Sequence, residues 1–373
     1  MKGRKLLMIP GPIEFEPEVL QALGAPTTSH TAPNFIDSFG SCLKMMKQVW
    51  ECPDGQSFII AGSGTLAMDM AGANLIENGD KALVICTGYF GERYAELLKR
   101  YGAEVTILKS DTGDTVDFSA IEETLKKNDF KLMTFTHVDT STAVRVDPKP
   151  IGELGRKYNV LTVLDGVCSI AGEEMRQQEW GIDVALTASQ KAIGVPPGLA
   201  LLVASPKAIV AWKNRKTPVG NYYCDWSNWL PIMQAYEEGR PSYFGTPPVN
   251  LIVALEVSLK IILAEGMENR VARHKTLATE FRQKITDMGF QLLPVNEAYA
   301  TNTLSAIYYP KDIGGSDFMT LMAKSDIIIA PGLLRDLKGK YFRVGHMGSV
   351  NRSDIVSTLA AIEKAINQLK NLP

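Results

Sequence analysis

Short apolar segments alternate with longer amphipathic segments through the middle of this chain, and this alternation limits the possible folds more than any other feature. The short segments lack regular polar alternation, which is typical of strands buried on both faces. Seven such strands are expected, at residues 57–61, 82–86, 105–108, 132–137, 160–164, 184–187 and 200–204. Amphipathic helices are expected between them, at residues 66–76, 92–101, 118–127 and 151–158. The pattern therefore predicts an α/β fold with a large, mostly parallel, seven-stranded sheet and helices on both faces.

The pattern changes after residue 204, which indicates a second structural unit. Residues 206–247 are rich in Trp, Tyr, Pro and Gly, and we expect them to be irregular. A long helical region with a break at Gly266 is expected at residues 249–288. A smaller α+β domain is expected beyond it, with strands at 304–309, 327–330 and 341–344 and helices at 317–323 and 353–369. We therefore divide the chain into an N-terminal segment with the large domain, residues 1–264, and a small C-terminal domain, residues 265–373.

Charge and composition exclude several functional classes. The chain has 39 Lys and Arg residues and 41 Asp and Glu residues, so its net charge of −2 gives no reason to expect a nucleic acid partner. A membrane-spanning helix needs about 18 consecutive apolar residues, and no segment of the chain is that long, so no membrane partner is expected. The five cysteines form no Cys-x-x-Cys pair and the four histidines form no His-Glu-x-x-His motif, so neither a disulfide framework nor a bound metal is expected. Because the N-terminal apolar segment is too short for a signal peptide and the chain does not end in a peroxisomal signal, we expect a cytoplasmic protein.

A glycine-rich turn at residues 61–65 (Ala-Gly-Ser-Gly-Thr) follows the first expected strand and begins a helix. Glycine lets a ligand approach the backbone, and the free N–H groups of a helix N-terminus favour an anion, most often a phosphate. The turn also fits the Gly-x-Gly-x-x-Ala pattern of dinucleotide-binding folds. The next strand is followed by residues 87–88 (Thr-Gly) rather than by an acidic residue that could bind a ribose, which disfavours that interpretation. A tight turn without a ligand remains an alternative.

Two charged residues stand where strands of the expected sheet end. Asp165 ends one apolar segment, and Lys191 follows the next one. Each residue alone has a simpler interpretation, as a polar strand end or a solvated turn residue. Because the carboxyl ends of parallel strands meet at one edge of a sheet, both side chains are expected there beside the glycine-rich turn. An anion cradle, a buried carboxylate and a lysine that can form a Schiff base together meet the needs of pyridoxal phosphate.

Arg343 lies in an expected strand of otherwise apolar residues. A charge in such a strand is either paired inside the protein or directed at a ligand. A guanidinium group can bind a carboxylate through two hydrogen bonds, so a carboxylate ligand is one interpretation. Both interpretations remain open from the residues alone.

Through these residues the chain resembles the class V aminotransferases, which have the fold type I architecture of pyridoxal phosphate enzymes. The resemblance is greatest to the alanine–glyoxylate and serine–pyruvate aminotransferases, and it extends from residue 10 to the strand that contains Arg343. The order and spacing of the motifs are more specific than any one of them. The motifs are residues 61–65, 87–93 (Thr-Gly-Tyr-Phe-Gly-Glu-Arg), 136–142 (Thr-His-Val-Asp-Thr-Ser-Thr), 163–165 (Val-Leu-Asp), 189–192 (Ser-Gln-Lys-Ala) and 196–198 (Pro-Pro-Gly).

The resemblance implies roles for the residues around the cofactor. Lys191 would form a Schiff base with pyridoxal 5′-phosphate and then move the α-proton of the substrate, and Asp165 would pair with the pyridine nitrogen. Phe90 would stack on the cofactor ring, and Thr140 would hydrogen-bond its phenolic oxygen. The phosphate would be bound by Ser63, Gly64, Thr65 and Gln190.

The resemblance also implies which residues a second subunit contributes to the site and which residues bind the substrate. Tyr243 and Thr246 would reach the phosphate from the partner subunit, so a homodimer would be needed to complete the site. Arg343 would bind the substrate carboxylate. Gly11 and His30 would line the substrate pocket.

The resemblance thus implies a ping-pong transamination from a small amino acid, L-alanine or L-serine, to glyoxylate or pyruvate, giving glycine and pyruvate. Other class V enzymes remain alternatives: a serine–pyruvate or ureidoglycine–glyoxylate type aminotransferase, or a lyase or decarboxylase. A cysteine desulfurase would need a reactive cysteine in a later loop, but the last cysteine is Cys224, and Cys168 is more simply a buried residue. An NAD-dependent dehydrogenase and a catalytically silent dimer of the same fold are more remote alternatives.

Overall fold

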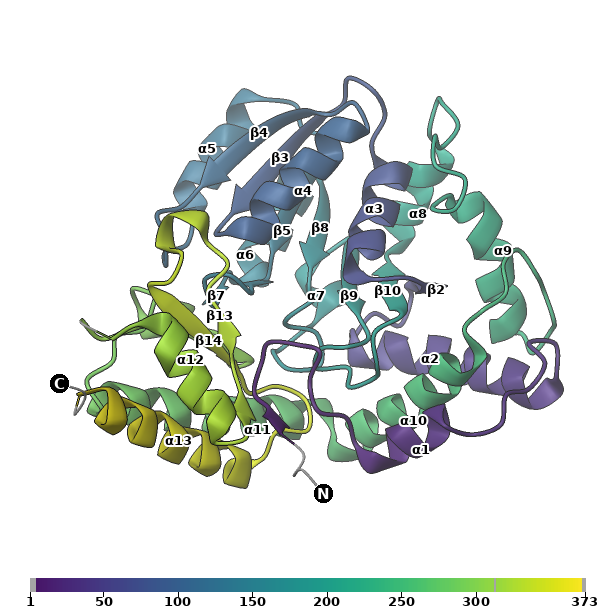
Figure 1. Cartoon of the computed structure of the whole chain (residues 1–373). Helices are drawn as coiled ribbons and strands as arrows, with labels where there is room; N and C mark the ends of the chain where they lie inside the picture. The colour runs from purple at the N-terminus through teal and green to yellow at the C-terminus, as the bar shows by residue number, and fades with distance from the viewer. Residues whose placement is uncertain (1–4, 312, 371–373) are drawn as a thin grey trace.

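A seven-stranded sheet forms the centre of the computed structural model, which describes residues 5–311 and 313–370 (Figure 1). The strand order is β2-β10-β9-β8-β5-β3-β4, and every neighbouring pair is parallel except the two pairs that involve β10. The structure confirms the predicted α/β class and the mostly parallel sheet. The bounds are β2 Gln56–Ala61, β3 Lys81–Cys86, β4 Glu104–Lys109, β5 Leu132–Thr136, β8 Leu161–Asp165, β9 Val184–Ala188 and β10 Leu199–Ala204. The chain ends on which the cytoplasmic expectation rests, residues 1–4 and 371–373, lie outside the described ranges.

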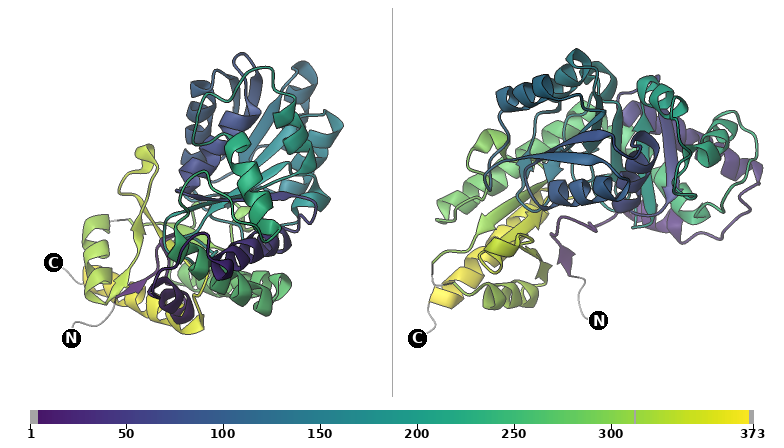
Figure 2. Two further views of the ribbon diagram at one scale, coloured as in Figure 1. Left: turned by 90° about the vertical axis from the view of Figure 1, so that its right-hand side faces the viewer. Right: turned by 90° about the horizontal axis from the view of Figure 1, so that it is seen from above.

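Helices cover both faces of this sheet, as predicted (Figure 2). Asp117 and Asp147 are the N-cap residues of α5 and α6. The side-chain carboxylate of each accepts a hydrogen bond from an N–H group of the first helical turn. Caps of this kind stabilise a helix by about 1 kcal/mol. None of the described helices is long and apolar enough to cross a membrane. The bounds are α3 Gly64–Leu75, α4 Tyr89–Arg100, α5 Phe118–Lys127, α6 Pro148–Lys157 and α7 Gln177–Trp180.

The segment 206–247 is not irregular throughout, so that expectation was wrong. It contains two helices, which begin at side-chain caps from Ser205 and Asp225. Trp226 at the start of the second helix is fully buried and stacks on Phe58 of β2, with 5.2 Å between the ring centres. Tertiary packing of aromatic residues thus stabilises a helix in a segment whose composition suggested none. The bounds are α8 Pro206–Lys213 and α9 Trp226–Glu237.

Two N-terminal helices have no counterpart among the predicted elements. Both begin with proline, which is favourable at the first helical position. The longer one, α2, packs against α9 and against the first of the two long helices that follow. Those helices are separated at Gly266, whose φ of +82° favours glycine, so the predicted break is confirmed. The bounds are α1 Pro17–Leu23, α2 Pro33–Val49, α10 Val249–Glu265 and α11 Met267–Asp287.

The C-terminal elements form a smaller α+β unit around a three-stranded antiparallel sheet, β11-β14-β13. A second apolar cluster, which includes the fully buried Phe281, Phe318 and Phe342, forms the core of this unit. We assigned the N-terminal segment to the large domain, but β1 pairs with β12 and Met8 lies in this second cluster. The division of the chain at residue 265 stays a prediction. The bounds are β1 Leu6–Leu7, β11 Leu304–Tyr308, β12 Ile327–Ile328, β13 Ala330–Pro331, β14 Tyr341–Gly345, α12 Gly315–Lys324 and α13 Arg352–Lys370.

Candidate active site

Many of the predicted site residues meet in a cavity of about 190 Å³ at the carboxyl edge of the large sheet. β8 ends at Asp165, and Lys191 follows β9. Because β8 and β9 are parallel, both residues leave the sheet at the same edge. Eight of the predicted residues line the cavity: Ser63, Gly64, Thr65, Phe90, Thr140, Asp165, Gln190 and Lys191. Five further residues line it as well: Met68, Arg93, Thr136, Val138 and Val167.

Lys191 lies against the N-terminal segment. Its Nζ donates a hydrogen bond to the carbonyl oxygen of Pro10. A Cβ atom on Gly11 would lie only 2.6 to 2.9 Å from the end of the lysine side chain, and the φ of +116° at Gly11 also favours glycine. The structure therefore brings Gly11 to the lysine, while its contact with a substrate stays a prediction.

Asp165 is a buried carboxyl group in the cavity wall. It is 2% exposed, and its Oδ1 accepts a hydrogen bond from the N–H of Val167 at 3.0 Å. Burial raises the pKa of Asp165 from 3.8 to about 7, and the opposing charges of Arg93 and Lys191 have smaller effects. A cation that donates a hydrogen bond would stabilise the ionised form at this depth. The protonated ring nitrogen of pyridoxal phosphate is such a group, so Asp165 fits this cofactor.

The N-terminus of α3 has the donors that a phosphate needs. The side chain of Ser63 makes no capping hydrogen bond, which leaves its hydroxyl and the first N–H groups of the helix for an anion. A Cβ atom on Gly64 would lie 2.7 Å from a methyl group of Val167, so glycine is needed there. The buried side-chain oxygen of Gln190 has no partner among the described residues, which is unfavourable unless a ligand supplies one. These free polar groups indicate a polar ligand at this end of the cavity.

Arg93 lines the cavity but was missed by the sequence interpretation. Its Nη2 donates a hydrogen bond to Oγ1 of Thr65 at 2.7 Å, beside the α3 N-terminus. Its positive charge adds to the positive end of the helix dipole and therefore favours a phosphate. A signal was present, because Arg93 follows Phe90 by three residues on α4 and this spacing places both on one helix face.

Phe90 is positioned by Asp139, a second residue whose role was not predicted. The carboxylate of Asp139, in the short strand β6 (Val138–Asp139), accepts a hydrogen bond from the N–H of Phe90 at 3.0 Å. It also accepts hydrogen bonds from the N–H and the hydroxyl of Ser141. A Cβ atom on Gly88 would lie 2.5 to 2.7 Å from these two side chains. Asp139 therefore caps α4 through a tertiary contact and orients the ring that is predicted to stack on the cofactor.

Arg343 reaches the cavity wall from the small sheet. Its Nη1 donates to the carbonyl oxygen of Thr140 at 3.2 Å, and its Nε donates to that of Pro331 at 2.9 Å. The Thr140 hydroxyl itself donates to Sγ of Cys168 at 2.7 Å. Burial lowers the pKa of Arg343, which is 7% exposed. Both contacts of the guanidinium are with backbone carbonyls rather than with a carboxylate, so its charge is left for a ligand.

Five predicted residues are not part of the cavity lining: Gly11 and Arg343, which contact lining residues, and Tyr243, Thr246 and His30, which do not. Tyr243 is 62% exposed, and its hydroxyl lies 3.4 Å from that of the exposed Thr246. The ring of His30 lies 5.4 Å from the ring of Tyr243. The structure thus groups these last three residues with one another rather than with Lys191, and their contacts with a ligand stay predictions.

The fold and the cavity define an α/β enzyme in which a lysine, a buried aspartate and a helix N-terminus suited to an anion line one cavity. Residues 18–334 match the family described as aminotransferase class V. The chain belongs to this family, whose members depend on pyridoxal 5′-phosphate and have the fold type I architecture.

Similar proteins cover nearly the whole chain. An uncharacterized aminotransferase of Methanocaldococcus jannaschii is 39% identical, over 98% of this chain and 94% of that protein. Alanine–glyoxylate aminotransferase 1 of Saccharomyces cerevisiae is 38% identical over 93% of each chain. L-aspartate–glyoxylate aminotransferase of Paracoccus denitrificans is 32% identical, over 99% of this chain and 93% of that protein. The crystal structure of alanine–glyoxylate aminotransferase from Nostoc sp. has 30% identity and a TM-score of 0.92, over 98% of this chain and 96% of that chain.

We predict that Asp165 makes the stability of the cofactor-free protein depend on pH. Its pKa is about 7 in the folded state and near 3.8 in the unfolded chain, so unfolding releases a proton between about pH 4 and pH 7 and folding stability falls as the pH rises through this range. Asp165→Asn lacks this group. Relative to wild type, its free energy of unfolding should therefore rise between pH 4 and pH 7, by a few kcal/mol at about 1.4 kcal/mol per pKa unit.

Urea denaturation of both proteins at pH 4, 5.5 and 7 measures this difference. The exposed residue Asp111 gives a control variant, Asp111→Asn, for which no such trend is expected. A difference between Asp165→Asn and wild type that stays constant over this range would contradict the prediction.

Proposed function

We propose that this enzyme transfers the amino group of a small amino acid, L-alanine or L-serine, to glyoxylate or pyruvate in a ping-pong reaction, with glycine and pyruvate as products when the substrates are L-alanine and glyoxylate. The observation that carries the proposal is the position of Lys191, Asp165 and the α3 N-terminus in one cavity, with Arg343 bonded to the backbone of Thr140 in its wall. Glyoxylate appears in the names of the yeast, Paracoccus and Nostoc proteins, which supports it as the acceptor.

The residues of the cavity have complementary tasks in such a reaction. Pyridoxal phosphate, when bound, supplies an electron-accepting ring that stabilises negative charge at the substrate Cα. The amine of Lys191 removes the proton from this Cα, and Asp165 keeps the ring nitrogen protonated. Thr65 and Arg93 would hold the phosphate of the cofactor at the α3 N-terminus. Donor and acceptor then use the same residues in turn, which is the basis of the ping-pong order.

The size and charge of the site favour small monocarboxylate substrates. The cavity has a volume of about 190 Å³, whereas typical ligand pockets have volumes of about 300–1,000 Å³. The cofactor and the substrate must share this space. We assign the substrate carboxylate to Arg343, since Arg93 is hydrogen-bonded on the phosphate side. The L-aspartate–glyoxylate relative is named for a dicarboxylate donor, so the donor has to be tested directly.

Alternative reactions of the family receive less support. For a cysteine desulfurase, both Cys168 and Cys224 are buried, and burial raises the pKa of Cys224 to about 12, which disfavours a thiolate nucleophile. A lyase or decarboxylase would use the same lysine and aspartate. A serine–pyruvate or ureidoglycine–glyoxylate type aminotransferase would differ only in its substrates. Kinetics with defined substrates must distinguish these reactions.

We predict that the purified protein is yellow with pyridoxal phosphate, that L-alanine bleaches the visible band and that glyoxylate restores it. Each change is one half-reaction, so the absorption spectrum follows both separately. Lys191→Ala should abolish turnover, because no amine remains to move the proton. A protein that stays colourless with added cofactor would disprove the proposal, and faster bleaching by L-aspartate or L-glutamate than by L-alanine would disprove the proposed donor class.

We predict that Arg343→Gln raises KM for L-alanine by about 10- to 100-fold, because a hydrogen bond to a charged group contributes about 1.5–3 kcal/mol. The affinity for pyridoxal phosphate should stay the same, since Arg343 is assigned to the substrate. Arg335→Gln is a matched control, because Arg335 is an exposed arginine in the adjacent turn (Arg335–Leu337). Steady-state kinetics of both variants check this. An unchanged KM in Arg343→Gln would remove this residue from the substrate site.

We also propose a homodimer in which Tyr243 and Thr246 complete the phosphate site of the partner subunit. Both residues are exposed and lie outside the cavity of their own chain, which supports this arrangement. A Tyr243→Phe/Thr246→Val double variant should bind the cofactor weakly. Mixed with Lys191→Ala, it should form heterodimers with one intact site and regain about a quarter of wild-type activity from a random 1:1 mixture. The assay uses a cofactor concentration that saturates only the wild type. If mixing the two variants does not increase the activity, the result argues against shared sites.

A further inference from the structure

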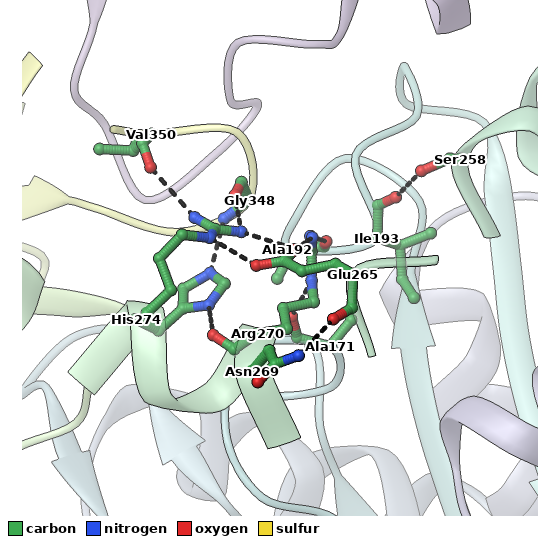
Figure 3. A network of polar contacts seen from close by, with 11 residues as sticks. Ala171, Ala192, Ile193, Ser258, Glu265, Asn269, Arg270, His274, Gly348 and Val350 are labelled. Atoms are coloured by element: carbon green, nitrogen blue, oxygen red, sulfur yellow. Dashed lines mark hydrogen bonds and ion pairs between the residues drawn. The ribbon is translucent and has the colours of Figure 1, made fainter. Parts of the chain in front are cut away.

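The turn that follows Lys191 is held from outside the cavity by two helices. Arg270, on α11, donates a hydrogen bond through Nη2 to the carbonyl oxygen of Ala192 at 2.8 Å. Ser258, on α10, donates one through Oγ to the carbonyl oxygen of Ile193 (Figure 3). The two residues directly after the reactive lysine are thus each tied to a helix that lies outside the cavity lining.

The same guanidinium also holds the chain that follows Asp165. Its Nε donates to the carbonyl oxygen of Ala171 at 2.8 Å, in the turn after β8 (Figure 3). Its Nη1 donates to Oε2 of Glu265 at 2.8 Å, so three of its nitrogens bind three different partners. Because the guanidinium is planar and rigid, these bonds fix the turn after Lys191 relative to the turn after Asp165.

Arg270 is buried, and the groups around it hold it in place. Its side chain is 6% exposed, so the carbonyls that it binds have no ready access to water. The Nδ1 atom of His274 lies 2.7 Å from the carbonyl oxygen of Arg270, and its Nε2 accepts a hydrogen bond from the N–H of Gly348 at 2.9 Å. Loss of the guanidinium would leave two buried carbonyls without a donor, which favours movement of the turns that carry them.

Arg273 provides a built-in comparison on the same helix. It shares the carboxylate of Glu265, with Nε to Oε1 at 2.6 Å. Its Nη1 and Nη2 donate to the carbonyl oxygens of Val350 and Gly348, each at 3.1 Å. Arg273 therefore has the same charge and the same ion-pair partner as Arg270, but its remaining hydrogen bonds go to the C-terminal segment rather than to the turn after Lys191.

We propose that Arg270 is a positioning residue that sets the place of the Lys191 amine relative to Asp165. It acts through the backbone at Ala192 and Ala171 and touches neither substrate nor cofactor. The inference rests on the proposed function, in which this amine moves a proton at the substrate Cα. Proton transfer is sensitive to position, and a displacement of about 1 Å can lower a rate by about 100-fold.

The test compares Arg270→Met, Arg270→Lys and Arg273→Met in the full-length protein loaded with pyridoxal phosphate. Three quantities are measured: the thermal midpoint without cofactor, the pH midpoint of the visible absorption band, and kcat and KM for L-alanine with glyoxylate. Both methionine variants should lower the thermal midpoint, because each removes a partner of Glu265. Only Arg270→Met should shift the pH midpoint and lower kcat, by about 10- to 100-fold, with KM changed much less. Arg270→Lys should restore part of kcat, since an ammonium group can bind one of the two carbonyls.

Two results would overturn the proposal: an equal loss of kcat in the two methionine variants, or a wild-type kcat and pH midpoint in Arg270→Met. If Arg270→Met does not fold, Ser258→Ala provides the test, because it releases the Ile193 carbonyl on the other side of the turn. It should then shift the pH midpoint and lower kcat by a smaller factor, and wild-type values would overturn the proposal. A wild-type protein without a visible band would instead overturn the proposed function on which the inference rests.

Discussion

The parallel pairing of β8 with β9 is the constraint on which the rest of the site depends. Asp165 is the last residue of β8 and pairs with Leu186 of β9, and the chain of β9 then continues to Lys191. Hydrogen bonds between neighbouring strands hold them about 4.8 Å apart, so the two functional groups begin from fixed points at one sheet edge. The N-terminus of α3 follows β2 at the same edge. A lysine, a carboxylate and an anion cradle can therefore face one ligand without a flexible loop to bring them together.

Burial changes the proton affinity of the groups in the cavity and makes the stability of the protein depend on a bound ligand. A carboxyl group as deeply buried as Asp165 is held at a raised pKa, and its ionised form gains most when a cation binds beside it. Ser63 makes no capping hydrogen bond and the buried side-chain oxygen of Gln190 has no partner among the described residues, so a polar ligand would stabilise both groups. The fold thus arranges several unfavourable groups around one cavity, and a cofactor of matching charge relieves them together.

Much of the fold and of the candidate site was predictable because the relevant signals are local. Strands buried on both faces, a glycine-rich turn before a helix and polar residues at strand ends are all read from neighbouring residues. The predictions failed where stability comes from distant contacts. The helix that begins at Trp226 depends on Phe58 far away in the chain, and the capping of Phe90 depends on Asp139. Arg93 combines a local and a distant signal. Its helical spacing from Phe90 can be read from the sequence, but its hydrogen bond to Thr65 cannot.

The sequence by itself determined the class of fold, the family and most of the residues that line the cavity, because these depend on periodicity and on short motifs whose spacing is rigid in strands and helices. Only the tertiary structure decided how the lysine is supported. Pro10 and Gly11 meet Lys191 from the start of the chain, and Arg270 holds the turn after it from a helix far along the chain. Such contacts join segments that no local pattern connects. Their partners are largely backbone carbonyls, which every residue has and no sequence motif can mark.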